Sequence, residues 1–116
     1  MRHRVSGRTL GRKTAPRMLM YRNLTRDLFL REAIVTTEAK AKETRSFAER
    51  MVTLGKDGSL PARRRALKFI PDKDVVDKLF RVYGERYQDR PGGFTRIIKI
   101  GPRQGDAAPM VRLELV

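Results

Sequence analysis

The chain has 116 residues, which suits a single domain, and its 27 Lys and Arg against 13 Asp and Glu give a formal net charge of +14. This excess predicts a polyanionic partner, with nucleic acid ahead of an anionic membrane surface or a merely charged exterior. The absence of cysteine and the single histidine, His3, exclude disulfides, thiolate zinc sites and Cys- or His-based catalytic clusters, and no apolar run approaches the roughly 20 residues of a membrane span.

Residues 1–13 are expected to form an extended basic arm, and residues 14–116 a single globular domain. The arm has too few apolar residues for a core face. The first 26 residues carry eight Lys or Arg and no Asp or Glu, so more than half of the net charge lies in less than a quarter of the chain. Phosphates would neutralise such a segment, whereas a flexible, solvated tail is the plainer alternative.

Two helices are predicted on either side of a short strand. The first begins near Thr14 and carries an apolar stripe at helical spacing. The β-branched run 33–37 predicts a strand that ends at a helix N-cap, Thr37. The second helix is expected over residues 38–54, with Gly55 just past its C-terminus.

Two further helices are predicted in the middle of the chain. Ser59 caps a short third helix that contains three consecutive arginines and ends at Pro71. Asp72 caps a fourth helix with the clearest amphipathic pattern in the sequence. Its apolar positions are Val75, Val76, Leu79, Phe80 and Tyr83.

Residues 94–100 and 110–116 alternate in polarity and predict an antiparallel hairpin around a connection at 101–109. The residues expected to share one face of the first strand are Phe94, Arg96, Ile98 and Ile100. The apolar face of the second consists of Val111, Leu113 and Leu115. The strand at 33–37 is expected to join them, because a lone hairpin is marginal. The predicted fold class is therefore α+β, with about four helices packed on a small, three-stranded, mixed sheet and an extended basic N-terminal arm.

The basic residues of the predicted helices have two interpretations. At most two of the three arginines at 63–65 can face one line of phosphates, and a solvated helix face is an equally good interpretation. The cations near the start of the second helix, Lys40, Lys42 and Arg45, have two interpretations as well: they contact phosphate, or they offset the charges of Glu38 and Glu43. The aromatic residues are mostly at core spacing, with base stacking by Tyr87 or Phe94 as the lesser alternative.

Catalysis has little support. Asp72, Asp74 and Asp77 cluster, but Asp72 suits a cap and Asp74 lies in a first helical turn, where an acid favours the helix dipole. We expect no catalytic residue, no metal, no cofactor and no small-molecule substrate. A metal-dependent RNA-processing enzyme that uses the three aspartates is a third hypothesis.

Motifs along the whole chain occur in a specific order. The first are Met1-Arg2-His3-Arg4, Gly7-Arg8, Leu10, Arg12 and Tyr21-Arg22-Asn23-Leu24. The next are Thr36-Thr37, Ala39-Lys40-Ala41-Lys42-Glu43, Arg45, Arg90 and Gly92-Gly93-Phe94-Thr95-Arg96-Ile97. The last are Gly105-Asp106, Ala108-Pro109-Met110 and Glu114-Leu115-Val116. Together they resemble the bacterial large-subunit ribosomal protein seventeen family, although Gly11 and Pro16 stand where that family more often has Asn and His.

The resemblance implies a one-domain α+β protein without a catalytic role of its own. It would bind large-subunit ribosomal RNA and lie near the polypeptide exit side, beside neighbouring large-subunit ribosomal proteins. The RNA contacts that the resemblance implies are Arg2, His3, Arg4, Arg8, Arg12, Arg22, Lys40, Lys42, Arg45 and Arg96. The pattern of charge adds Lys13, Arg17, Arg26, Arg63, Arg64, Lys99 and Arg103 as candidates.

The expected location is the cytoplasm, on the ribosome and away from membranes. No hydrophobic segment follows the charged start, so a secretory signal is not expected, and the motif that begins at Met1 leaves no room for an organellar presequence. The alternative function is a free-standing nucleic-acid-binding protein, such as a nucleoid protein or an RNA chaperone.

Overall fold

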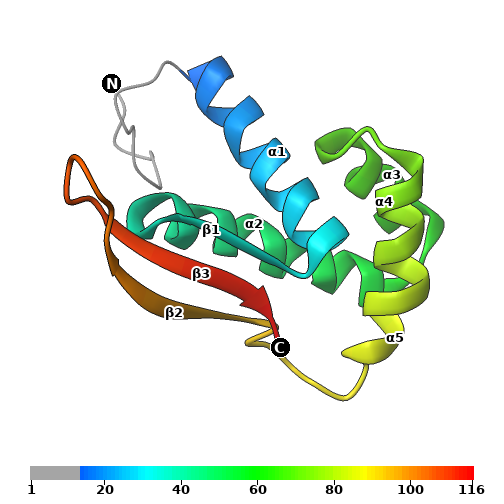
Figure 1. Cartoon of the computed structure of the whole chain (residues 1–116). Coiled ribbons are helices and arrows are strands. Elements are labelled where there is room, and N and C mark those ends of the chain that lie inside the picture. The colour runs from blue at the N-terminus through cyan, green and yellow to red at the C-terminus, as the bar shows by residue number, and fades with distance from the viewer. Residues whose placement is uncertain (1–13) are drawn as a thin grey trace, which may run out of the picture.

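The computed structural model describes residues 14–116 (Figure 1). Its elements are α1 (Thr14–Arg31), β1 (Ala33–Thr37), α2 (Glu38–Asp57), α3 (Leu60–Phe69), α4 (Lys73–Lys78), the π-helical segment η1 (Leu79–Tyr83), α5 (Gly84–Arg86), β2 (Thr95–Pro102) and β3 (Pro109–Leu115). The predicted α+β class and the C-terminal antiparallel hairpin are confirmed. The predicted arm lies outside the described residues, as do the contacts assigned to Arg2, His3, Arg4, Arg8, Arg12 and Lys13.

The sheet of residues 14–116 has the strand order β1-β3-β2, and both pairs are antiparallel. Leu113 of β3 lies opposite Ile34 of β1 and Ile97 of β2. The prediction of a mixed sheet is wrong. β1 and β2 run in the same direction, but β3 lies between them, so no parallel pair forms.

The helices cover one face of the sheet, with α2 next to it (Figure 1). The buried face of α2 consists of Ala41, Thr44, Ala48, Met51, Val52 and Gly55. From the sheet, β3 contributes the predicted apolar face of Val111, Leu113 and Leu115, which are 0%, 0% and 7% exposed. The core is therefore sealed between α2 and the central strand, and the outer face of the sheet remains open to solvent.

The predicted N-caps begin their helices as expected. Thr37 Oγ1 accepts a hydrogen bond from Lys40 N, and Ser59 Oγ accepts one from Ala62 N. Asp72 Oδ1 accepts from the backbone N–H groups of Asp74 and Val75. Each cap satisfies N–H groups that the first turn of a helix leaves without a partner.

The C-terminus of α2 was predicted wrongly. The helix does not end at Leu54 but continues to Asp57, and the left-handed residue that follows it is Gly58, with φ of 73°. Gly55 instead lies inside the helix, buried where α2 meets η1. It is glycine because a side chain there would collide with Leu79, not because the helix ends.

The predicted fourth helix is divided into α4, η1 and α5, which follow one another without a break. Side chains from the end of α4 and from η1 bind the C-terminus of α1, whose last carbonyls lack partners within the helix. Tyr83 Oη donates to Phe29 O at 2.6 Å, and Lys78 Nζ donates to Leu30 O at 3.3 Å. These side chains join the first helix to a segment about 50 residues later in the chain.

The face predicted for the first hairpin strand is right only in part. Arg96, Ile98 and Ile100 are exposed, but Phe94 is 2% exposed and packs with the ring of Tyr87 at 5.3 Å. Phe94 precedes the first strand residue, Thr95, so strand alternation does not govern its direction. Core packing thus removes both Tyr87 and Phe94 from a role in base stacking.

Candidate nucleic-acid interface

The starts of α1 and α2 and the β2–β3 connection lie at the same end of the molecule (Figure 1). Thr37, the cap of α2, pairs with Met110 of β3, and Glu38 and Lys99 line one shallow depression beside the hairpin. The predicted candidates that gather here are Arg17, Lys40, Lys42, Arg45, Lys99 and Arg103, which we call the basic end. The fold therefore brings together cations from three segments that are far apart in the sequence.

Some cations of the basic end are offset by carboxylates. Lys42 Nζ lies 3.7 Å from the carboxylate of Glu38, one helical turn earlier. Arg103 holds Asp106 at 2.6 Å, and its hydrogen bond lowers the pKa of that carboxyl and raises the pKa of the guanidinium. Arg103 therefore keeps its charge, but two of its five N–H donors already bind Asp106.

Three other cations of the basic end, Lys40, Arg45 and Lys99, are more available. Lys40, Arg45 and Lys99 have no carboxylate within 4.0 Å among the residues that the structure describes. An exposed ammonium or guanidinium without a carboxylate partner can exchange water for phosphate at little cost. These three residues, two exposed and Lys40 half-buried, make the basic end a candidate surface for a polyanion.

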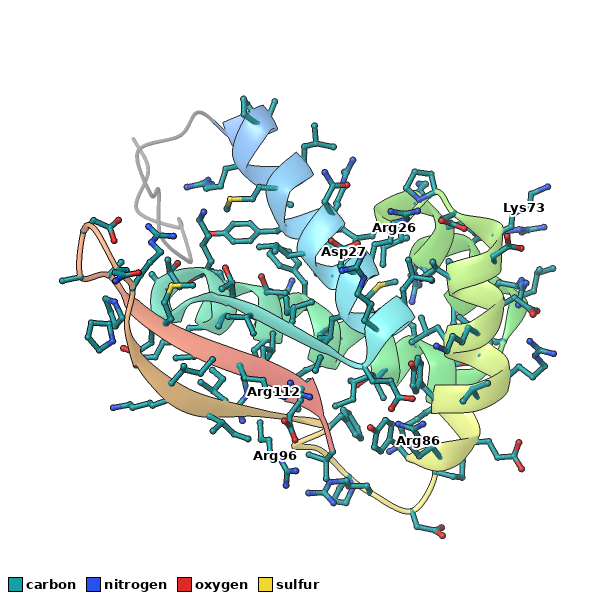
Figure 2. The ribbon with its side chains drawn as sticks, in the orientation of Figure 1. Arg26, Asp27, Lys73, Arg86, Arg96 and Arg112 are labelled. Carbon is teal, nitrogen blue, oxygen red and sulfur yellow. The ribbon has the colours of Figure 1, made fainter. Side chains whose placement is uncertain are left out.

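Arg22 and Arg26 lie elsewhere, on the face of α1 that looks toward the α3–α4 connection. Figure 2 shows Arg26 extending from α1, where its Nε donates to Asp72 Oδ2 at 2.9 Å. The guanidinium of Arg22 stacks over the ring of Phe69 at 5.6 Å. Together with Asn23, these arginines border a separate pocket.

Arg63 and Arg64 are not part of the basic end, because α3 lies at the far side of the molecule (Figure 1). Arg63 lies 3.5 Å from Asp77 and over the ring of Phe80, so its charge and stem already have partners. Arg64 is exposed beside it. The partners of Arg63 favour the structural interpretation for that residue, whereas Arg64 has no carboxylate within 4.0 Å in residues 14–116.

Arg96 belongs to a third surface, the open face of the sheet. It and Arg112 both contact Glu114, at 2.6 and 2.8 Å, and Figure 2 shows the two arginines side by side. Their hydrogen bonds lower the pKa of Glu114. Arg112 was not among the predicted candidates, although strand alternation placed it opposite the apolar face of β3, and that was the signal available.

Two of the three aspartates of the enzyme hypothesis, Asp72 and Asp77, have side-chain partners. Asp72 caps α4 and holds Arg26, and these hydrogen bonds lower its pKa. Asp77 lies between Arg63 and Arg81 at 3.5 and 3.3 Å. Within residues 14–116, no group of three His, Cys, Asp or Glu side chains is arranged to hold a metal ion. No helix in the same range is long and apolar enough to span a bilayer.

The described part of the chain is a small, basic α+β domain in which cations from α1, α2 and the β2–β3 hairpin lie at one end. The sequence profile of the family described as Ribosomal protein L17 matches residues 20–116. The large ribosomal subunit protein bL17 of Dehalococcoides mccartyi is 55% identical over 116 residues, which cover 100% of this chain and 99% of that protein. Its counterpart in Pelobacter propionicus is 59% identical over 100% of this chain and 91% of that protein.

The bL17 protein of Desulfitobacterium hafniense is similar as well, with 56% identity over 94% of this chain and 97% of that protein. The chain belongs to the ribosomal protein L17 family. The resemblance stated from the sequence motifs is confirmed.

Proposed function

We propose that this chain is a structural constituent of the large ribosomal subunit, where it binds and stabilises folded ribosomal RNA through the N-terminal arm and the basic end. The observation that carries the proposal is the position of Lys40, Arg45 and Lys99. They lack carboxylate partners in the described residues and lie at the end of the molecule where α1 begins. Membership of a family whose relatives are named as large-subunit proteins supports it.

The mechanism is scaffolding. The globular part docks on the RNA surface, and residues 1–13 enter between RNA segments, where their positive charge offsets phosphate repulsion. Distant RNA elements can then pack against one another. Ordering of the arm costs conformational entropy only when it binds.

The proposal also covers the setting. The chain acts in the cytoplasm, on the ribosome, beside neighbouring large-subunit proteins near the exit side, and it has no catalytic role. The domain of residues 14–116 docks on the RNA surface, and the arm of residues 1–13 enters between RNA segments. Arg22, Arg26 and Arg96 contribute additional RNA contacts on two other surfaces, and Arg63 and Arg64 contribute the least.

The test is retention on the particle. Cells express the tagged full-length chain, and large subunits are sedimented through a high-salt cushion. A variant with Arg4, Arg8 and Arg12 changed to Gln is compared with a control in which Lys68, Lys73 and Arg81 are changed to Gln, since both lose three charges. We expect the control to sediment with the subunit and the arm variant to be lost.

Two results contradict the proposal. The first is an arm variant that is retained as well as the control. The second is an unmodified chain that leaves the subunits at low ionic strength or is found mainly on other nucleic acid. The second result would favour the free-standing nucleic-acid-binding protein instead.

A further inference from the structure

A pocket of about 270 Å³ lies between α1 and the α3–α4 connection. One wall is a stripe of α1 at i, i+3, i+4 and i+7, formed by Leu19, Arg22, Asn23 and Arg26. The other wall is formed by Ile70, Pro71 and Asp72. The pocket lies just below the usual size range of small-molecule sites, about 300–1,000 Å³, so it suits a single ring system rather than a base pair.

The floor of the pocket is apolar. Ile70 is 1% exposed and closes it from below, whereas Leu19 is 57% exposed on the rim and Pro71 is exposed opposite. An exposed leucine and proline on facing walls leave apolar surface in water. A flat aromatic ring placed between them would remove that surface from water.

The charges of the pocket argue against a bare phosphate as its occupant. Arg26 donates to Asp72 Oδ2, and Oδ1 of the same carboxylate caps α4, so this ion pair is satisfied within the protein. Only Arg22 remains without a carboxylate partner in the described residues, and its guanidinium lies on the rim, over Phe69. A neutral base fits the interior, and one phosphate fits the rim.

Asn23 supplies the polar group that recognition requires. Within residues 14–116 its side chain makes no hydrogen bond, so both its carbonyl and its amide are available at the pocket. One asparagine amide can donate and accept at once. An unpaired adenine presents an acceptor beside the N6 donor on two edges, at N7 and at N1, and asparagine is a common partner of adenine in this arrangement.

We propose that this pocket binds a single unstacked adenosine of the large-subunit ribosomal RNA. Leu19 and Pro71 hold the base, Asn23 reads its edge and Arg22 contacts its phosphate. The inference rests on the proposed function, because RNA binding supplies the ligand. It adds a base-specific site to a surface that otherwise contacts phosphates without regard to sequence.

The experiment compares N23A with Q88A in the full-length chain. Gln88 is an exposed amide in the turn after α5 and does not line the pocket, so the control removes the same group. Both sites are exposed and Asn23 lies on a helix, where alanine is a better helix former, so both variants should fold. Affinity for in vitro transcribed large-subunit RNA is measured at one salt concentration. We expect the Kd of N23A to rise about tenfold and that of Q88A to stay within about twofold.

Dimethyl sulfate probing of assembled large subunits identifies the nucleotide, since the reagent methylates N1 of accessible adenines. In N23A particles one unpaired adenine should gain reactivity that Q88A particles do not show. Two results would contradict the adenosine site but leave the proposed function intact. One is an N23A variant that binds RNA with wild-type affinity. The other is a protein side chain that occupies the pocket in the assembled subunit. If the wild-type chain itself does not bind the RNA, both fail.

Discussion

Gly84 packs directly against the backbone of Gly55, so the helical rod of α4, η1 and α5 crosses α2 with no side chain between them. A Cβ placed on Gly84 would lie 2.8 Å from the carbonyl carbon of Gly55, and one on Gly55 would lie 3.0 Å from Leu79 O. Close approach of this kind is available only to glycine. The contact sets how near the C-terminal helical segments come to the central helix.

The first prediction is that Gly84→Ala destabilises the fold. Alanine gains roughly 1 kcal/mol of helix propensity, but overpacking of a backbone contact costs about 1–3 kcal/mol and often more where the neighbour is main chain. We expect a net loss of about 1–2 kcal/mol in the free energy of unfolding, because the contact lies at the costly end of that range. Urea denaturation followed by far-UV circular dichroism measures it.

Gly92→Ala is the matched control, because a Cβ there meets no atom within 4 Å and Gly92 does not have a positive φ. It should change the free energy of unfolding by less than about 0.5 kcal/mol. Equal stability of the two variants would show that α2 and α5 can separate without cost.

The second prediction concerns the buried hydroxyl of Tyr83, which donates to Phe29 O at 2.6 Å. Tyr83→Phe leaves a carbonyl at the end of α1 without this partner and should cost about 1–3 kcal/mol in the free energy of unfolding. Tyr87→Phe, whose hydroxyl reaches Val116 O from a partly buried position, should cost less. Burial raises the pKa of Tyr83 to about 12, so ultraviolet titration should show one tyrosine that ionises late. A loss no greater than that of Tyr87→Phe would contradict the capping role.

The third prediction is an acid-dependent loss of stability at the open face of the sheet. Arg112 and Arg96 lower the pKa of Glu114 below its ordinary value of 4.5. A lowered carboxyl pKa contributes stability at neutral pH that disappears as the pH falls below the ordinary value toward the folded-state pKa. Glu114→Gln should therefore be less stable than the wild type at neutral pH and should show a smaller further loss on acidification.

Urea midpoints at pH 7 and about pH 3 measure this dependence. Glu85→Gln, which removes an exposed glutamate without an ion pair in the described residues, serves as the control and should keep the acid dependence of the wild type. If Glu114→Gln retained the full acid dependence, the arginine pair would have no part in it.

The fourth prediction separates the basic end from the rest of the cationic surface. Lys99→Ala should weaken binding to large-subunit RNA and reduce the slope of log affinity against log salt by about one. Lys68→Ala on α3 removes an exposed lysine from the opposite side and should leave the slope unchanged. Identical slopes for both variants, measured by filter binding across a salt series, would mean that charge acts without regard to position.

Local features of this fold were predictable because each depends on neighbours within a few residues. Thr37, Ser59 and Asp72 cap helices through side chains that reach the next turn. Strand alternation likewise predicted the buried face of β3. The same locality explains one error: Phe94 lies just outside its strand, and packing against Tyr87 determines its direction.

The sequence by itself determined the charge excess, the helices and strands, their caps and the family, since these follow from composition and short-range spacing. Only the tertiary structure decided that Gly55 meets Gly84 instead of ending a helix, and that β3 separates β1 from β2. It also placed the start of α2 beside the β2–β3 hairpin while it left α3 at the other side. These relationships join residues about 30 to 80 positions apart, and packing between such segments has no signature in local periodicity.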